Sequence, residues 1–270
     1  MTTIALPLEV GELRAMLPDD PIGGIEWGAA DTRALIESDP AQVRGQADVE
    51  TILAVGGTVI VDRVSSLLPA LRRPERMLGE RVGIPSGLCE AKLFLSGPGG
   101  GLPLHFDRFD SIQIQLAGEK RWQLTPGVAV SCPLHSHLAG ADPMPALSRY
   151  CDPEDLLAPP REEVIFLPGQ TLHIAAGRWH ATEVSEGISI SLAMRLAIPS
   201  WIHLLTPDSR QLALGDSAFR QRTAGFWDGG GRLSAAGEAH LRQLLARPDA
   251  GTCTVGDGVG SRFDPLAVLE

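Results

Sequence analysis

The sequence predicts a mainly β protein, a β-sandwich or barrel, with helical elements before the strands and a small helical appendage after them. Between residues 88 and 200, short apolar runs alternate with Gly and Pro, as expected of many short strands joined by turns. Residues 111–116 alternate polar and apolar side chains, which is the period of a strand with two different faces. After Pro199 the spacing becomes helical. We therefore expect one domain over residues 1–200 and a small helical region over residues 201–270.

The segments before the strands carry weaker signals. Residues 1–50 are expected to be loops with one short helix near Asp31–Glu37, where Asp31 is suited to accept bonds from free N–H groups. Thr58–Val61 is predicted to be a strand. Residues 64–79 are predicted to be helical, because their leucines fall near one face.

The β region and the tail can be divided further. Residues 125–160 are rich in Pro and are predicted to be a long insertion or lid between strands, a kind of loop that often carries function. In the tail, residues 207–224 and 234–247 are predicted helices, and Ser234 is the expected N-cap of the second. The predicted strands are Ala91–Leu95, Ser111–Leu116, Arg121–Leu124, Val164–Leu167, Thr171–Ile174, His180–Val184 and Ile188–Leu196.

Composition excludes several classes of function. The 270 residues carry a net charge of -10, and an acidic surface repels phosphate backbones, so direct nucleic-acid binding is not expected. The four cysteines are scattered without a C-x-x-C pair, which argues against a disulfide scaffold. Neither a signal peptide nor a membrane-spanning apolar run is predicted. We expect a cytoplasmic protein.

A candidate metal site begins at His105-x-Asp107. Side chains at i and i+2 of a strand share a face, so this spacing places one nitrogen and one oxygen donor side by side. His180 is the best candidate for a third ligand, with His173 as its competitor. Two histidines and one carboxylate leave coordination positions open, which suits non-haem iron(II) better than a closed zinc site. Because H-x-D is a weak motif by itself, the surrounding residues must support it.

Two further groups of residues bear on this site. His135-Ser-His137 with Cys132 offers a separate metal cluster, but the loop lacks an obvious fourth ligand and a surface loop is the favoured interpretation. Ser111, Gln113 and Gln115 form a polar strand face that could meet either solvent or a ligand cavity, and solvent is the commoner case. Lys120, across the following turn, is a cation suited to hold the far carboxylate of a dicarboxylic acid.

These motifs together resemble a known family. The stretch Ser96-Gly-Pro-Gly-Gly-Gly101, the pair His105-x-Asp107, the stretch Gln115-Leu-Ala-Gly-Glu-Lys120-Arg-Trp122 and the stretch from Leu167 to His180 look like the JmjC-type cupin oxygenases, closest to their ribosomal-oxygenase (cupin-4) branch. The resemblance spans roughly residues 50–200 and implies a double-stranded β-helix, or jelly-roll barrel. It also implies Fe(II) at His105, Asp107 and His180, and a pairing of Lys120 with the 5-carboxylate of 2-oxoglutarate.

The sequence departs from the family pattern at one co-substrate contact. Family members often place a tyrosine on the strand before the metal motif, where this chain has Leu93 or a neighbour. Ser189, Ser191 and Arg195 alternate on a late strand and share a face. The resemblance implies that this face lines the pocket, so Ser191 or Arg195 is the candidate replacement.

The resemblance implies an Fe(II)- and 2-oxoglutarate-dependent dioxygenase. The expected reaction is hydroxylation of a side chain in a protein or peptide, with a basic ribosomal protein as one candidate for the acidic surface. A free amino acid or small peptide is the alternative substrate. A non-catalytic cupin-like binding module is the alternative of another class. A homodimer through the C-terminal helices is a further expectation, although the tail is shorter than that of the ribosomal oxygenases.

Overall fold

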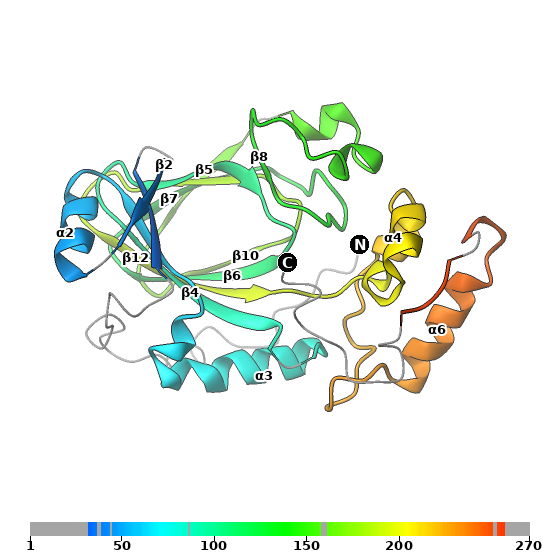
Figure 1. Cartoon of the computed structure of the whole chain (residues 1–270). Helices are drawn as coiled ribbons and strands as arrows, with labels where there is room; N and C mark the ends of the chain where they lie inside the picture. The colour runs from blue at the N-terminus through cyan, green and yellow to red at the C-terminus, as the bar shows by residue number, and fades with distance from the viewer. Residues whose placement is uncertain are drawn as a thin grey trace.

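Two antiparallel sheets form the two layers of a double-stranded β-helix, or jelly roll (Figure 1). The structure, a computed structural model, describes residues 32–36, 39–43, 45–85, 87–157, 161–250 and 253–256. Within these residues the larger sheet has the order β10-β6-β12-β4-β3-β1-β2, and the smaller sheet the order β8-β5-β11-β7-β9. The strands are β1 Thr32–Ile36, β2 Asp39–Gln42, β3 Thr58–Val61, β4 Cys89–Ser96, β5 Gly101–Phe106, β6 Asp110–Ala117, β7 Lys120–Leu124, β8 His137–Leu138, β9 Glu162–Phe166, β10 Thr171–Ile174, β11 His180–Glu183 and β12 Ser189–Leu196.

Consecutive strands alternate between the two sheets, from β4 to β7 and again from β9 to β12. This connectivity gives a jelly roll. All strands predicted between residues 88 and 200 are present, with boundaries shifted by one or two residues. The mainly β fold expected from the alternating pattern is therefore confirmed.

One face of the larger sheet packs on the main hydrophobic core. Alternate side chains of β6 and β12 are almost completely buried there, in one apolar cluster with Leu78 of helix α3 (Arg72–Val82). Figure 1 shows α3 beneath this sheet, where it contacts β4. The other side chains of β6 and β12 consequently face the smaller sheet.

The elements before β4 differ in part from those predicted. Thr32–Ile36 is the strand β1 and not the short helix expected near Asp31–Glu37, while Asp31 itself lies outside the described residues. β1 pairs with β2 on one side and β3 on the other, and this pairing satisfies its backbone in a way that a single helical turn could not. Helix α2 (Gln46–Ala54) extends into a region predicted as loop.

The helix predicted over residues 64–79 is divided. Two 3-10 turns, η1 (Val64–Ser66) and η2 (Pro69–Leu71), precede α3. A proline disfavours helical geometry at the residue before it, and Leu68 accordingly has φ -116° and ψ 83°. The regular helix therefore begins only after Pro69.

The C-terminal region is helical as predicted, but with shorter helices. The segment 207–224 contains two helices, α4 (Pro207–Ala213) and α5 (Ser217–Arg220), and residues 234–247 contain α6 (Ala235–Leu245). Ser234 caps α6 by accepting a hydrogen bond from the backbone N–H of Gly237 at 3.2 Å. These elements share the apolar cluster of the larger sheet.

The remaining short elements are 3-10 turns: η3 Leu147–Arg149, η4 Pro153–Leu156, η5 Trp201–Leu204 and η6 Pro248–Ala250. None of the helices in the described ranges combines the length and the apolar character that crossing a bilayer requires.

Candidate metal centre

The polar face of β6 lines a cavity between the two sheets. Ser111 and Gln113 are only 6% and 9% exposed, and both lie in the wall of a cavity of about 500 Å³. Of the two environments considered for this strand face, the structure has the ligand cavity. The wall also includes Lys92, Phe94, His105, Asp107, Ser136 and Arg195.

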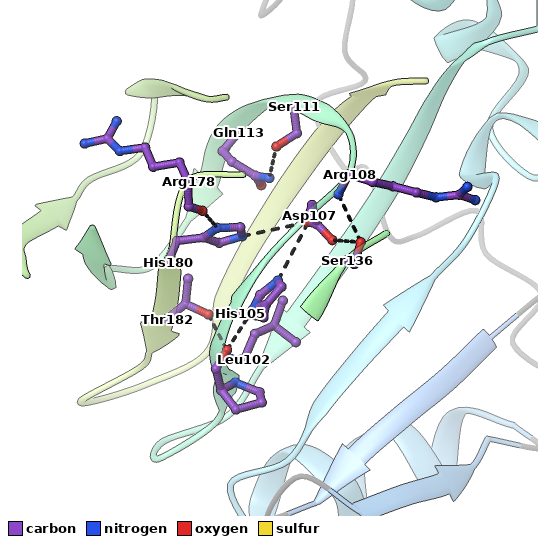
Figure 2. Close-up of polar contacts among 11 residues, drawn as sticks. Leu102, His105, Asp107, Arg108, Ser111, Gln113, Ser136, Arg178, His180 and Thr182 are labelled. Atoms are coloured by element: carbon purple, nitrogen blue, oxygen red, sulfur yellow. Dashed lines mark hydrogen bonds and ion pairs between the residues drawn. The ribbon is translucent and has the colours of Figure 1, made fainter. Parts of the chain in front are cut away.

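His105 and Asp107 line this cavity, and His180 lies next to them. β11 pairs with β5 so that His180 lies directly opposite His105, and Asp107 follows the last residue of β5. The Oδ2 atom of Asp107 lies 3.7 Å from Nε2 of His105 and 3.8 Å from Nε2 of His180 (Figure 2). Potential ligand atoms of the three residues all lie within 4.8 Å of one another. Three residues separated by up to 75 positions therefore meet at one point.

Backbone carbonyls determine which ring nitrogens face that point. Nδ1 of His105 lies 2.7 Å from the carbonyl oxygen of Pro103, and Nδ1 of His180 lies 2.9 Å from that of Arg178 (Figure 2). A carbonyl oxygen only accepts, so each Nδ1 must carry the proton. Each Nε2 then presents a lone pair, which is the form in which histidine binds metals.

The charges within the group also favour metal binding. Burial alone would raise the pKa of Asp107, but His105, His180 and a hydrogen bond from Ser136 hold that pKa well below its usual range. Burial and the neighbouring His105 lower the pKa of His180 to about 4, so this ring is neutral at physiological pH. Burial also acts to lower the pKa of His105, but the Asp107 carboxylate outweighs it and the pKa is raised. The group thus combines an ionised carboxylate at Asp107 with a neutral imidazole at His180.

This donor set fits a metal ion that keeps open positions. Two imidazole nitrogens and one carboxylate oxygen are the protein ligands typical of non-haem iron(II), whereas a structural zinc site needs four. Within the described part of the chain, no other group of His, Cys, Asp or Glu side chains is clustered closely enough to hold a metal ion.

Lys120 is a buried cation on a neighbouring strand. β7, which carries it, pairs with β11, which carries His180. Lys120 is 3% exposed, and its ammonium donates a hydrogen bond to Oγ of Ser191 at 3.0 Å. Burial lowers the pKa of Lys120 to about 8. Among the described residues, no carboxylate lies within ion-pair distance of this ammonium, so the site lacks a protein anion to balance it.

The two candidates for a replacement co-substrate contact have different environments. Ser191 contacts Lys120, whereas Arg195 forms an ion pair with Glu90 and lies 4.3 Å from the ring centroid of Phe109. Leu93, expected at the place of the family tyrosine, is fully buried in the main core. Both of its neighbours, Lys92 and Phe94, line the cavity, and the Lys120 ammonium lies 5.8 Å from the ring centroid of Phe94.

The alternative metal ligands lie elsewhere. His173, the competitor for the third position, is on the edge strand β10, with its Nε2 3.4 Å from Asp110. Nδ1 of His135 lies 3.1 Å from the hydroxyl of Tyr150. Cys132 and His135 do not form a metal-binding group with His137. The surface loop predicted for this motif is found only in part, because His137 lies in β8 and is buried.

Ser136 is a site residue that sequence reasoning missed. Its hydroxyl donates a hydrogen bond to Oδ1 of Asp107 at 3.1 Å (Figure 2). The motif His135-Ser-His137 drew attention to its histidines, and the serine between them is the one that contacts the triad. The contact depends on the pairing of β8 with β5. Because β8 is only two residues long, the sequence pattern does not predict this pairing.

The chain resembles several known proteins in sequence. Residues 86–204 match the JmjC domain family. The uncharacterized protein YxbC of Bacillus subtilis (strain 168) is 30% identical over 171 residues, which cover 62% of this chain and 52% of YxbC. Ribosomal oxygenase 2 of Rattus norvegicus is 28% identical over 97 residues, which cover 36% of this chain and 18% of that protein. The chain therefore spans about half of YxbC and a smaller share of the rat protein.

Among solved structures, Escherichia coli YcfD, a ribosomal oxygenase in complex with cobalt and 2-oxoglutarate, is 19% identical, with a TM-score of 0.44. The match covers 92% of this chain and 62% of the YcfD chain. The JmjC match extends over every strand that carries a member of the triad, and also over Lys120 and Ser191. Residues 86–204 of the chain thus match the JmjC domain family, and a ribosomal oxygenase is among the proteins that the chain resembles.

Proposed function

We propose that this chain is an Fe(II)- and 2-oxoglutarate-dependent oxygenase that hydroxylates a side chain of a protein or peptide. The observation that carries the proposal is the convergence of His105, Asp107 and His180, two of which line a cavity, together with a buried lysine on the neighbouring strand β7 that has no carboxylate partner among the described residues. A metal site alone would account for the triad. The unbalanced ammonium calls for an anionic ligand as well.

His105, Asp107 and His180 would hold the iron. With 2-oxoglutarate, Fe(II) supplies the capacity to activate dioxygen and oxidise a C–H bond. The protein's contribution is to keep the two imidazoles in the correct tautomer through the carbonyls of Pro103 and Arg178, so that both Nε2 lone pairs stay directed at the ion. No reorientation of the ligands is then needed when the ion binds.

Lys120 and Ser191 would bind the distal carboxylate of 2-oxoglutarate. An ammonium removed from water attracts a carboxylate more strongly than a solvated one does, because the local dielectric is low. The Ser191 hydroxyl, 3.0 Å from the ammonium, directs the Lys120 side chain and offers a second contact in place of the absent tyrosine. A carboxylate there would also raise the lowered pKa of Lys120.

Two observations bear on the target. The net charge of -10 favours a basic protein or peptide, and one relative is named a ribosomal oxygenase, so ribosomal proteins are the first candidates. The cavity volume of about 500 Å³ lies in the range of small-molecule sites, which keeps a free amino acid or small peptide as the competing substrate class.

The test is turnover of 2-oxoglutarate to succinate by the Fe(II)-loaded protein, with and without candidate substrates. We expect turnover in the wild type and in His173→Ala, a matched histidine variant outside the triad, but none in His105→Ala or Asp107→Ala. Mass spectrometry of candidate ribosomal proteins, peptides and amino acids should show the gain of one oxygen atom. Iron binding without any consumption of 2-oxoglutarate would instead indicate a non-catalytic binding module and refute the proposal.

A further inference from the structure

We infer that Ser136 is a positioning residue for Asp107, through which the insertion between β7 and β9 becomes part of the metal centre. The inference rests on the proposed metal site. It concerns a side chain that does not touch the metal position itself, and that acts by fixing one oxygen of the Asp107 carboxylate.

The strand register explains why Ser136 reaches Asp107. β8 pairs antiparallel with β5, and the paired residues are His105 with Leu138 and Phe106 with His137. In an antiparallel ladder the next pair moves forward on one strand and back on the other. That pair is Asp107 with Ser136, so the contact follows from the register of the two strands.

The hydrogen-bond directions around Ser136 are determined by its partners. The backbone N–H of Arg108 donates to Oγ of Ser136 at 3.0 Å (Figure 2). An ionised carboxylate only accepts, so the single hydroxyl hydrogen of Ser136 must go to Oδ1 of Asp107, at 3.1 Å. Ser136 thus accepts a hydrogen bond from the backbone of Arg108 and donates one to the Asp107 carboxylate.

This relay distinguishes the two carboxylate oxygens. Oδ1 is the oxygen bonded to Ser136, whereas Oδ2 is the oxygen that lies 3.7 Å and 3.8 Å from the histidine nitrogens. With Oδ1 occupied, Asp107 is held in the orientation that presents Oδ2 beside His105 and His180. Without Ser136 the carboxylate could rotate. Orientations in which Oδ2 no longer faces the metal position would then be populated, and the metal ion would bind more weakly.

The insertion is anchored well enough to hold Ser136 in place. The backbone N–H of Ala139 donates to the carbonyl of Leu104 at 2.9 Å, and His137 is buried against Phe106 and Trp179. Among the described residues of the insertion, Ser136 is the one whose side chain hydrogen-bonds a member of the triad. The predicted insertion therefore contributes a group to the site.

The competing interpretation is that the contact is an ordinary surface hydrogen bond. Ser136 is exposed, and the side chain of Asp107 is 38% exposed, so water could replace the hydroxyl at little cost. The two interpretations differ in what they predict for metal affinity.

The experiment measures Mn(II) affinity of the full chain, from the electron paramagnetic resonance signal of free Mn(II), in four proteins. These are the wild type, Ser136→Ala, Ser136→Thr, which keeps the hydroxyl, and Ser131→Ala, an exposed serine of the same insertion as matched control. We expect Ser136→Ala to bind Mn(II) roughly 10–100-fold more weakly, the usual effect of losing a group that orients a metal ligand. Ser136→Thr and Ser131→Ala should bind close to wild type.

A second measurement separates positioning from a loss of structure. The visible spectrum of bound Co(II) should change in Ser136→Ala and be restored in Ser136→Thr, while the melting temperatures of the metal-free proteins stay alike. Wild-type Mn(II) affinity in Ser136→Ala would overturn the inference. Failure of the wild type to bind Mn(II) at all would instead refute the proposed metal site, so the two failures can be told apart.

Discussion

Replacing Lys120 with Met should make the metal-free protein more stable near neutral pH while it removes the response to 2-oxoglutarate. Burial lowers the pKa of Lys120 from its ordinary 10.5 to about 8, which means that the folded state holds the charge at a cost. A tenfold change in an equilibrium constant is about 1.4 kcal/mol, so this cost is about 3 kcal/mol at pH 7. Losing the hydrogen bond to Ser191 offsets about 1 kcal/mol, which leaves a net gain of about 2 kcal/mol.

The pH dependence has a definite sign. Between about pH 8 and 10.5 the unfolded chain binds a proton on Lys120 that the folded chain has lost, so the stability of the wild type should rise with pH in this window. Below about pH 8, Lys120 is protonated in both the folded and the unfolded chain, so the folded wild type bears the full free-energy cost of the buried charge. The advantage of Lys120→Met should therefore be largest at neutral pH and should shrink toward pH 10.

Urea unfolding of the metal-free proteins at about pH 7 and about pH 9.5 measures both effects. The matched variant is Lys92→Met, whose lysine forms an ion pair with Asp62 and whose loss should destabilise. Saturating 2-oxoglutarate with Mn(II) should stabilise the wild type by about 2.7 kcal/mol at a hundred times the dissociation constant, but Lys120→Met no more than Mn(II) alone does. A metal-free Lys120→Met protein less stable than the wild type by 2 kcal/mol or so would refute the reasoning, because it would show that the ammonium is well compensated within the protein.

Three further variants test other parts of the site. Ser191→Ala should remove the hydrogen bond to the Lys120 ammonium and weaken 2-oxoglutarate binding, measured by calorimetry. The Mn(II) affinity in the absence of 2-oxoglutarate should be unchanged, and weaker Mn(II) binding would contradict the position assigned to Ser191. Trp179→Ala removes a fully buried side chain that packs on Phe106 and should cost about 3–5 kcal/mol in urea unfolding, while a loss below 1 kcal/mol would mean that the cluster is poorly packed. Gly101→Ala would place a Cβ 1.9 Å from the carbonyl oxygen of Thr182, so β5 must move away from β11. We expect a lower melting temperature together with weaker Mn(II) binding. Wild-type values of both quantities would show that the two strands adjust without cost.

The strands of the jelly roll were predictable because their pattern is local. The alternation in residues 111–116 and the Gly and Pro residues between runs depend only on neighbours in the sequence. The i, i+2 spacing likewise placed His105 and Asp107 on one side of the chain without knowledge of the fold. Both the alternation and the i, i+2 spacing are found in the structure, because long-range contacts do not override these local patterns.

The misassigned elements are those that distant contacts or a single proline decide. Residues 32–36 are short enough to form either a helical turn or a strand, and pairing with β3 selects the strand. Pro69 delays the helix predicted from residue 64, although the leucine spacing is helical. Hydrophobic periodicity predicts neither the pairing of β1 with β3 nor the effect of Pro69 on the start of the helix.

The choice between His173 and His180 shows where pattern reasoning ends. Both histidines lie on predicted strands, and spacing alone does not say which sheet each strand joins. The topology does: β10 pairs with β6 in the larger sheet, whereas β11 lies between β5 and β7 in the smaller one. Only the latter placement puts a histidine beside His105. Ser136 was hidden for the same reason, since its place depends on the register of β8.

The strand order of the smaller sheet explains why the proposed metal ligands and the proposed co-substrate residue Lys120 share one face. β11 lies between β5 and β7, so His180 has His105 across one side, while Lys120 comes from the strand on the other. Lys120 is four residues, an even number, before the position paired with His180, and even spacing keeps both side chains on the inner face. The larger sheet then supplies Ser191 from above the same face. A one-residue shift of β7 against β11 would turn Lys120 away from the inner face, so the register of this single pair of strands links the proposed carboxylate site to the proposed metal site.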